Sequence, residues 1–233
     1  MIIDGFQKLT LLDYPGFVAC IIFTRGCNFK CSYCQNSPLI SYEKKGEFSE
    51  EEIFDYLKKR KGVLDGIVIS GGEPLLQPNL ISFIQRVKEL DLLVKIDTNG
   101  SNPRLLEQLI DNKLVDYVAM DIKNIFNKYG LTIGAKTNVD NIKKSIEILK
   151  QGKVDYEFRT TIVKELHTLE DISKIAKIVG QNSKFYLQNF ELSENVLNKE
   201  LHGFTKEEIK EIKEKLKDKY PNLEVRNGEM LNV

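Results

Sequence analysis

The chain has 233 residues, of which 42% are hydrophobic and 29% are charged, and this composition suits one globular α/β domain. Lys plus Arg and Asp plus Glu both number 34, so the chain has no net charge with which to attract nucleic acid or an anionic membrane. Its apolar runs are too short to span a membrane, and its first residues lack a signal-peptide pattern. Three of the four cysteines are crowded into one segment, which does not suit a disulfide framework, so we expect a cytoplasmic protein in a reducing compartment.

Short apolar runs alternate along the chain with stretches of helical periodicity. We expect strands at 17–24, 66–70, 93–98, 115–122, 155–163 and 184–190, with a last short strand at 223–226. We expect helices at 49–60, 78–90, 103–112, 138–151, 168–180 and 205–220, of which the first and the last begin with capping boxes. Strands that alternate with helices pair in parallel. Residues 1–233 are therefore predicted to form a single domain, a partial and laterally open (β/α)6 TIM-like barrel, although a doubly wound sheet fits the alternation nearly as well.

A cysteine-rich segment follows the first expected strand. It contains Cys27, Cys31 and Cys34, and three thiolates can hold a metal centre. They are one ligand short of the four that close a structural zinc site or an ordinary electron-transfer cluster. Three thiolates on a cubane cluster leave one iron open to a substrate, so the segment indicates an enzyme. Cys20 lies inside the apolar strand itself, and we interpret it as core packing.

Polar motifs follow the next four expected strands, where each strand ends. They are Ser70-Gly71-Gly72-Glu73-Pro74, Asp97-Thr98-Asn99-Gly100, Met120-Asp121-Ile122-Lys123 and Arg159-Thr160-Thr161. Because the carboxyl ends of parallel strands meet at one edge of a sheet or barrel, we expect these motifs and the cysteine segment to form one site.

Each motif also has an ordinary structural interpretation. Gly71-Gly72 alone favours a tight strand-to-helix turn. Asp97 and Asp121 alone suit helix caps, and Lys123 and Arg159 alone suit surface charges. The functional interpretation gains its weight from five signals on successive strand ends.

The spacing Cys-x3-Cys-x2-Cys, with Tyr33 directly before the third cysteine, resembles the signature of the radical S-adenosylmethionine (SAM) superfamily. Gly71-Gly72-Glu73-Pro74 resembles the second-strand motif of that superfamily, which contacts the amino group of the methionine moiety. A narrower resemblance is to the activating enzymes of glycyl radical enzymes, and its closest branch activates anaerobic ribonucleoside-triphosphate reductase. The segments that carry it are Leu12-Asp13-Tyr14-Pro15-Gly16, Tyr33-Cys34-Gln35-Asn36, Asp97-Thr98-Asn99-Gly100 and Asp121-Ile122-Lys123.

Two departures from that family are visible. Gln35 stands where many activating enzymes have His, but this position is not a cluster ligand. The chain also has no further cysteine cluster, so it has no room for the additional clusters that larger members carry.

The resemblance implies an oxidoreductase reaction under anaerobic conditions. Cys27, Cys31 and Cys34 would hold three irons of a 4Fe-4S cluster, and SAM would bind the fourth iron. Reductive cleavage of SAM would give a 5′-deoxyadenosyl radical, which takes a hydrogen atom from a glycine of the partner enzyme. A low-potential donor such as flavodoxin or ferredoxin would supply the electron, and no nucleic acid or membrane would be involved. The residues expected to contact SAM are Tyr33, Cys34, Gln35, Gly71, Gly72, Glu73, Asp97, Asn99, Asp121, Ile122, Lys123 and Arg159.

Charge balance adds one expectation. The SAM carboxylate would lie near Asp97 and Asp121, and carboxylates gathered without sufficient counter-charge are costly in a partly dry site. We therefore expect a bound cation, held by Asp97 and Asp121 with oxygens from Thr98 and Ala119, and the resemblance favours a monovalent ion. Helix capping by the two aspartates is the alternative.

Two other function classes stay open. A radical SAM enzyme acting on a small molecule, similar to the deazapurine carboxylate synthases, would use the same cysteines and the same glycine-rich turn. A zinc-binding module would use the cysteine segment alone, but three ligands make a poor structural zinc site. The long connection at 124–137, which carries Phe126 and Tyr129, is predicted to contact the partner or gate the site, unless it only packs its own aromatic rings.

Overall fold

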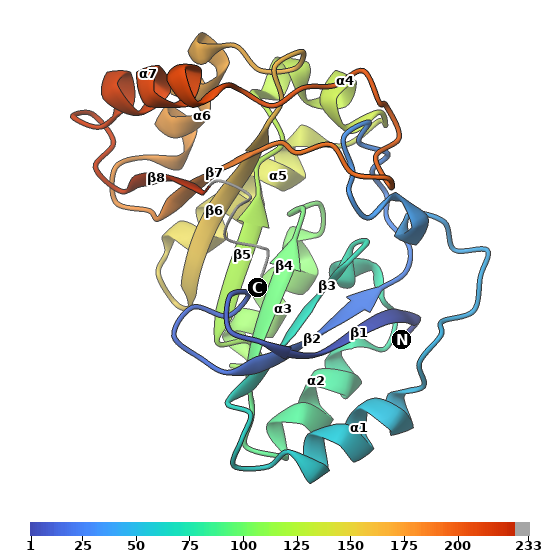
Figure 1. Cartoon of the computed structure of the whole chain (residues 1–233). Coiled ribbons are helices and arrows are strands. Elements are labelled where there is room, and N and C mark those ends of the chain that lie inside the picture. The colour runs from blue at the N-terminus through green and yellow to red at the C-terminus, as the bar shows by residue number, and fades with distance from the viewer. Residues whose placement is uncertain (227–233) are drawn as a thin grey trace.

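The computed structural model describes residues 1–226, and its eight strands form one sheet in chain order (Figure 1). The strands are β1 Ile3–Thr10, β2 Ala19–Thr24, β3 Gly66–Gly71, β4 Leu93–Thr98, β5 Tyr117–Asp121, β6 Asp155–Ile162, β7 Phe185–Asn189 and β8 Leu223–Arg226. β1 runs antiparallel to β2, and every later pair of neighbours is parallel. Within residues 1–226 no pairing joins β8 back to β1, so the barrel is open between them.

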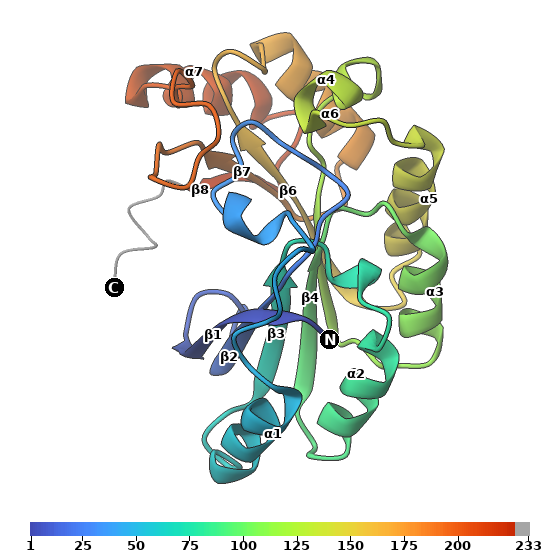
Figure 2. The ribbon, with the colours of Figure 1, turned by 90° about the vertical axis from the view of Figure 1, so that its right-hand side faces the viewer.

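Helices follow six of the strands and cover the outer side of the sheet, as α2, α3 and α5 show in Figure 2. The helices are α1 Glu50–Lys59, α2 Leu80–Lys88, α3 Pro103–Asp111, α4 Tyr129–Ile133, α5 Val139–Lys150, α6 Leu169–Val179 and α7 Lys206–Leu216. Short 3-10 turns are η1 Ser37–Leu39, η2 Pro74–Leu76 and η3 Phe126–Lys128. The six predicted strands correspond to β2–β7 and the six predicted helices to α1, α2, α3, α5, α6 and α7. This confirms the partial (β/α)6 barrel, and the strand order lacks the reversal that a doubly wound sheet requires.

The predicted capping boxes begin their helices as expected. At α1 the Glu52 amide donates to the Ser49 hydroxyl at 3.2 Å, and the Ser49 amide donates to the Glu52 carboxylate at 2.8 Å. Thr205 and Glu208 make the same reciprocal pair at α7. Each box satisfies amide groups that the first turn leaves without a helical partner.

Two elements were not predicted. β1 has a burial pattern without clean alternation, because it is an edge strand in which three consecutive residues, Gln7, Lys8 and Leu9, are all exposed. α4 is only five residues long, so it is too short to show a helical pattern of apolar residues in the sequence. It is followed by Gly134, which has a left-handed φ of 59°. No helix in the described part of the chain is long and apolar enough to cross a membrane.

Alternation along the central strands separates the core from the site. In β4, Val94 and Ile96 are fully buried and belong to the hydrophobic cluster that includes Phe83 of α2. Lys95 and Asp97 alternate with them and so lie on the opposite face, inside the barrel. The packing of helices on the outer face thus holds the inner face in place.

Candidate active site

A cavity of about 690 Å³ lies inside the barrel at the carboxyl ends of the strands. Cys27, Cys31 and Cys34 line it together with the polar ends of β3, β4, β5 and β6, so the structure brings the cysteine segment and the four motifs into one place. The other predicted site residues that line it are Tyr33, Gln35, Gly71, Gly72, Glu73, Asp97, Thr98, Asn99, Asp121, Lys123 and Arg159. Ala119 and Ile122 are fully buried and do not line the cavity.

The cysteine segment is held in place by backbone hydrogen bonds to two neighbouring segments. The Cys27 amide donates to the Ile40 carbonyl at 3.1 Å, and the Lys30 amide donates to the Ile133 carbonyl of α4 at 2.8 Å. Within the segment, the Cys34 amide donates to the Cys31 carbonyl at 3.0 Å. The loop is therefore ordered by the protein itself and presents its thiols to the cavity.

The three thiols of the site are free, and burial controls their protonation. Burial, assisted by the charge of Glu73, raises the pKa of Cys27 to about 12. Burial also raises the pKa of Cys31 and of Cys34. Because a metal binds the thiolate, each cysteine must release a proton when iron binds, and loading should become easier as the pH rises.

Alkylation of metal-free protein tests these pKa values. We expect the rate at which iodoacetamide modifies Cys27 in the folded protein to be still rising at about pH 10, because the reactive thiolate forms only near the raised pKa. In denatured protein, where an ordinary thiol pKa is about 8.5, the rate should level off near that pH. Peptide mass spectrometry would measure both rates. A plateau at the same pH in folded and denatured protein would contradict the expectation.

These thiols fit an iron–sulfur cluster better than a single metal ion. Among residues 1–226, no three His, Cys, Asp or Glu side chains are arranged to share one metal ion. A cluster does not need that convergence, because each thiolate binds a different iron. The single-ion arrangement that a zinc module requires is thus not formed by this segment.

The glycine pair after β3 lies directly against the cysteine segment. The Gly72 amide donates to the Thr24 carbonyl at 2.8 Å, and the Glu73 amide donates to the Gly26 carbonyl at 2.8 Å. A Cβ atom on Gly72 would lie 2.2 Å from the Gly26 carbonyl oxygen. The interpretation as a tight turn is therefore correct, and the turn also joins β3 to the loop that carries the cysteines.

Glu73 is fully buried, and its carboxylate accepts hydrogen bonds from other groups of the protein. One oxygen accepts from the Thr98 hydroxyl at 2.7 Å and the Leu75 amide at 3.1 Å, and the other accepts from the Asn99 amide at 2.6 Å. Burial raises the pKa of Glu73 to about 7. Its observed contacts make Glu73 a residue that positions the end of β4.

A chain of ion pairs crosses the floor of the cavity. Asp97 binds Lys95 through one oxygen at 2.5 Å, while Arg159 approaches its other oxygen at 3.4 Å. Arg159 also donates from Nε to one oxygen of Asp121 at 2.9 Å, and Lys123 donates to the other at 2.9 Å. We call these five side chains the charge network.

The network keeps both aspartates ionised. Burial alone would raise the pKa of Asp121, but the positive charges of Arg159 and Lys123 lower it to about 2. Burial also opposes ionisation of Asp97, yet Arg159 and Lys95 hold its pKa below the ordinary value. Neither aspartate caps a helix in the structure, so the helix-cap interpretation is wrong.

The predicted cation ligands are already engaged by other groups of the chain. Both oxygens of Asp97 and both oxygens of Asp121 accept from side chains. The Thr98 hydroxyl donates one hydrogen bond and accepts another. Ala119 lies inside β5 between two paired strands, so its carbonyl points along the sheet rather than into the cavity. A cation bound here would have to share or displace these partners.

Lys95 is the residue that the sequence analysis missed, and a signal for it existed. In the run Leu93–Thr98, alternation places Lys95 on the same face as Asp97. A lysine inside an apolar strand needs a partner when it is buried, and Asp97, two residues later, was the available one. The missing counter-charge in the cation argument was therefore present in the sequence.

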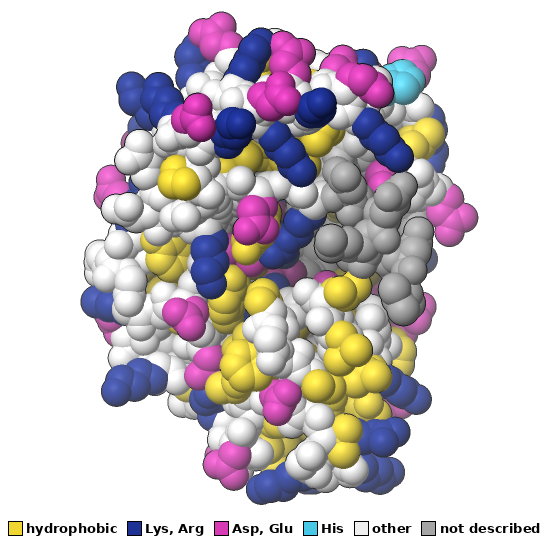
Figure 3. All heavy atoms as spheres, turned by 60° about the vertical axis from the view of Figure 1, so that its left-hand side comes forward, with side chains coloured by type: hydrophobic (Ala, Val, Ile, Leu, Met, Phe, Trp, Pro, Cys, Tyr) yellow, Lys and Arg dark blue, Asp and Glu magenta, His cyan; other side chains and the backbone are white. Residues whose placement is uncertain are grey.

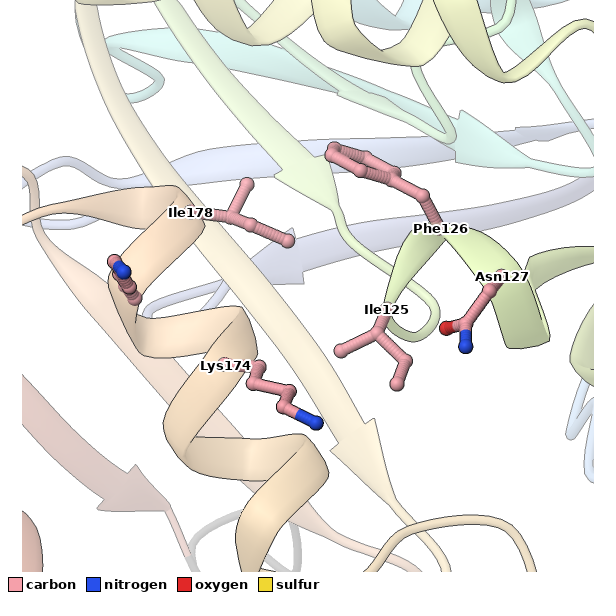
Figure 4. Close-up of a pocket in the computed structure, with 6 residues that line it drawn as sticks. Ile125, Phe126, Asn127, Lys174 and Ile178 are labelled. Carbon is pink, nitrogen blue, oxygen red and sulfur yellow. The ribbon is translucent and has the colours of Figure 1, made fainter.

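The segment 124–137 contains η3 and α4 rather than one long loop. Tyr129 is fully buried, and its hydroxyl accepts from the Lys123 amide at 3.2 Å. Phe126 and Ile125 face Lys174 and Ile178 of α6 across a surface hollow of about 480 Å³ (Figure 4). Neither aromatic ring lines the cavity of the cysteines, so neither is placed to gate it.

Comparison with known proteins gives the following similarities. The family model "Radical SAM superfamily" matches residues 21–182. Over 198 residues, the chain is 41% identical to "Putative glycyl-radical enzyme activating enzyme MJ1227" of Methanocaldococcus jannaschii, covering 82% of this chain and 80% of that one. It is also 32% identical over 185 residues to the pyruvate formate-lyase-activating enzyme of Clostridium pasteurianum, covering 76% of this chain and 75% of the relative.

The fold is similar to that of a solved structure. The chain superimposes on Streptococcus suis SuiB bound to S-adenosylmethionine with a TM-score of 0.70 and 17% sequence identity. The match covers 89% of this chain and about half of SuiB, 49%. At this identity the similarity concerns the fold alone.

Proposed function

Because this chain belongs to the radical SAM superfamily and, within it, to the glycyl-radical enzyme activating enzymes, we propose that it activates anaerobic ribonucleoside-triphosphate reductase. The family implies a 4Fe-4S cluster and SAM as cofactors. The observation that carries the proposal is the cavity in which three free thiols, with no fourth cysteine, face the polar ends of four strands. The choice of reductase as partner rests on the branch resemblance of residues 12–16, 33–36, 97–100 and 121–123.

The proposed roles follow from position. Cys27, Cys31 and Cys34 would hold the cluster. When bound, the reduced cluster and SAM together supply the 5′-deoxyadenosyl radical that takes hydrogen from a glycine of the partner. Lys123 and Arg159 would meet the SAM carboxylate, since both line the cavity with positive charge. The turn at 71–73 and the loop at 33–35 would contact the rest of SAM.

The mouth of the cavity supports a protein partner over a small polar substrate. Leu9, Leu11 and Leu12 line the cavity, and they are 53%, 67% and 50% exposed. Hydrophobic side chains also gather on the lower part of the face shown in Figure 3. Exposed apolar groups beside a site favour contact with another protein. A low-potential flavodoxin or ferredoxin is proposed as the electron donor.

The predicted monovalent cation stays a prediction without a role in this proposal. Its intended ligands, Asp97, Thr98, Ala119 and Asp121, are engaged within the chain. No part of the proposed reaction requires the cation.

An anaerobic assay tests the proposed function. Protein reconstituted with iron and sulfide, then reduced, is expected to convert SAM to 5′-deoxyadenosine. Addition of anaerobic ribonucleoside-triphosphate reductase should give a glycine-centred radical in electron paramagnetic resonance spectra. A radical on pyruvate formate-lyase but not on the reductase would move the proposal to another glycyl radical enzyme. Coupled turnover of a small molecule without any partner would support the synthase-like alternative instead.

A further inference from the structure

Lys95 is a buried charge that the proposed reaction does not use. Its side chain is 2% exposed, and its ammonium group donates to Asp97 at 2.5 Å. The ammonium also lies 6.0 Å from the centre of the Tyr117 ring, whose face favours a cation. Burying the charge of a lysine costs free energy unless a partner offsets it, and here that partner is Asp97.

The charge network already carries all the positive charge that its carboxylates require. Lys95, Lys123 and Arg159 face two aspartates, which leaves one positive charge in excess. Glu73 lies outside this network, bound to two amides and a hydroxyl. Even if Glu73 is counted as ionised, the side chains of the protein balance one another, so before SAM binds there is no negative excess for a mobile cation to offset.

We propose that Lys95 is a built-in cation that takes the place of an exchangeable metal ion beside Asp97 and positions the charge network for SAM. This inference rests on the proposed function, because SAM is the ligand that the network would meet. Lys95 binds Asp97, Asp97 contacts Arg159, and Arg159 binds Asp121. Loss of the ammonium would leave Asp97 to draw Arg159 away from Asp121. Lys95 is thus a positioning residue with no contact to the reacting atoms.

A salt series on the parent protein and Lys95→Ala tests the proposal. The chlorides of sodium, potassium, ammonium and the bulky tetramethylammonium ion are compared at equal ionic strength. The readouts are the melting temperature of metal-free protein and the 5′-deoxyadenosine yield of loaded protein. We expect both readouts of the parent to be the same in all four salts, because its cation is covalently attached.

The variant should behave differently. In tetramethylammonium chloride, Lys95→Ala should melt at a lower temperature than the parent. Its rate of SAM cleavage should be at least about tenfold lower, because the buried carboxylate of Asp97 has lost its partner. Ammonium, sodium or potassium ions fit the vacated space and should restore part of both. Recovery that depends on the kind of cation is a response that a purely structural lysine would not give.

Lys88→Ala is the matched control. Lys88 also pairs with an aspartate, Asp116, at 2.7 Å, but this pair lies at the amino ends of the strands, away from the cavity. Its removal should lower the melting temperature slightly and equally in all four salts, with turnover unchanged.

The outcomes separate the two proposals. A parent that requires sodium or potassium, or a folded Lys95→Ala that no small cation restores, would overturn the role of Lys95. If Lys95→Ala does not fold, Lys95→Met keeps the bulk without the charge, and a turnover equal to that of the parent would overturn it too. A parent that makes no 5′-deoxyadenosine would refute the proposed function, while the melting series would still decide whether Lys95 replaces a cation.

Discussion

Replacement of Cys31 by Ala is expected to abolish assembly of the 4Fe-4S cluster and to reduce SAM cleavage to background. Cys31 is the most buried of the three cavity thiols, 6% exposed, and it lies between the other two in the loop. With two thiolates left, a second iron would have no protein ligand, and the cluster would not be held. Iron and sulfide analysis after anaerobic reconstitution, together with a 5′-deoxyadenosine assay, measures both effects.

Cys20→Ala is the matched control for this variant. Cys20 lies in β2, is fully buried in the hydrophobic core, and does not line the cavity. Its loss should cost about 1 kcal/mol of stability through a small cavity but leave iron content and turnover at the parent level. A Cys31→Ala protein with full iron and normal turnover would refute the assignment of the triad, and loss of activity in Cys20→Ala would place the centre elsewhere.

The barrel and the edge that carries the site could be predicted because two periodicities were strong. Apolar runs such as that of β3 were long enough to be recognised, and the helices α1, α2, α3, α5, α6 and α7 each have a clear apolar face. Parallel pairing then brought the strand ends together. The contact between the Gly71-Gly72 turn and the cysteine segment follows from the neighbouring positions of β2 and β3 in the sheet.

Two features of the site were not predicted, one because it depends on tertiary contacts and one because a sequence signal was overlooked. The resemblance placed Glu73 among the residues expected to contact SAM, but the sequence did not show that its oxygens accept hydrogen bonds from Thr98, Leu75 and Asn99. The cation argument counted only the charges within the motifs and omitted Lys95, which reaches Asp97 from within the strand. Tertiary packing supplied the partners of Glu73, so the sequence could not show them, whereas strand alternation alone would have paired Lys95 with Asp97.

Gly72→Ala is expected to have the second large effect, and its cause is packing rather than backbone conformation. The added Cβ would lie 2.2 Å from the carbonyl oxygen and 2.7 Å from the carbonyl carbon of Gly26. Both are backbone atoms, so they have no side-chain rotation with which to move aside. The β3 turn must separate from the cysteine segment, which breaks the hydrogen bond from the Glu73 amide to Gly26. We expect a loss of about 3 kcal/mol in the free energy of unfolding and a sharp fall in iron content.

A glycine with room for a Cβ atom provides the control for the loss of stability expected in Gly72→Ala. Gly130 lies in α4, and a Cβ there would be 3.6 Å from its nearest neighbour, so Gly130→Ala should fit and favour the helix by up to about 1 kcal/mol. Denaturant unfolding of the metal-free proteins should therefore shift in opposite directions for the two variants. Because the comparison is made without cofactors, it separates contact between the two loops from any contact with SAM. If metal-free Gly72→Ala is as stable as the parent but does not bind SAM, Gly72 serves the cofactor directly, as its resemblance to the second-strand motif first implied.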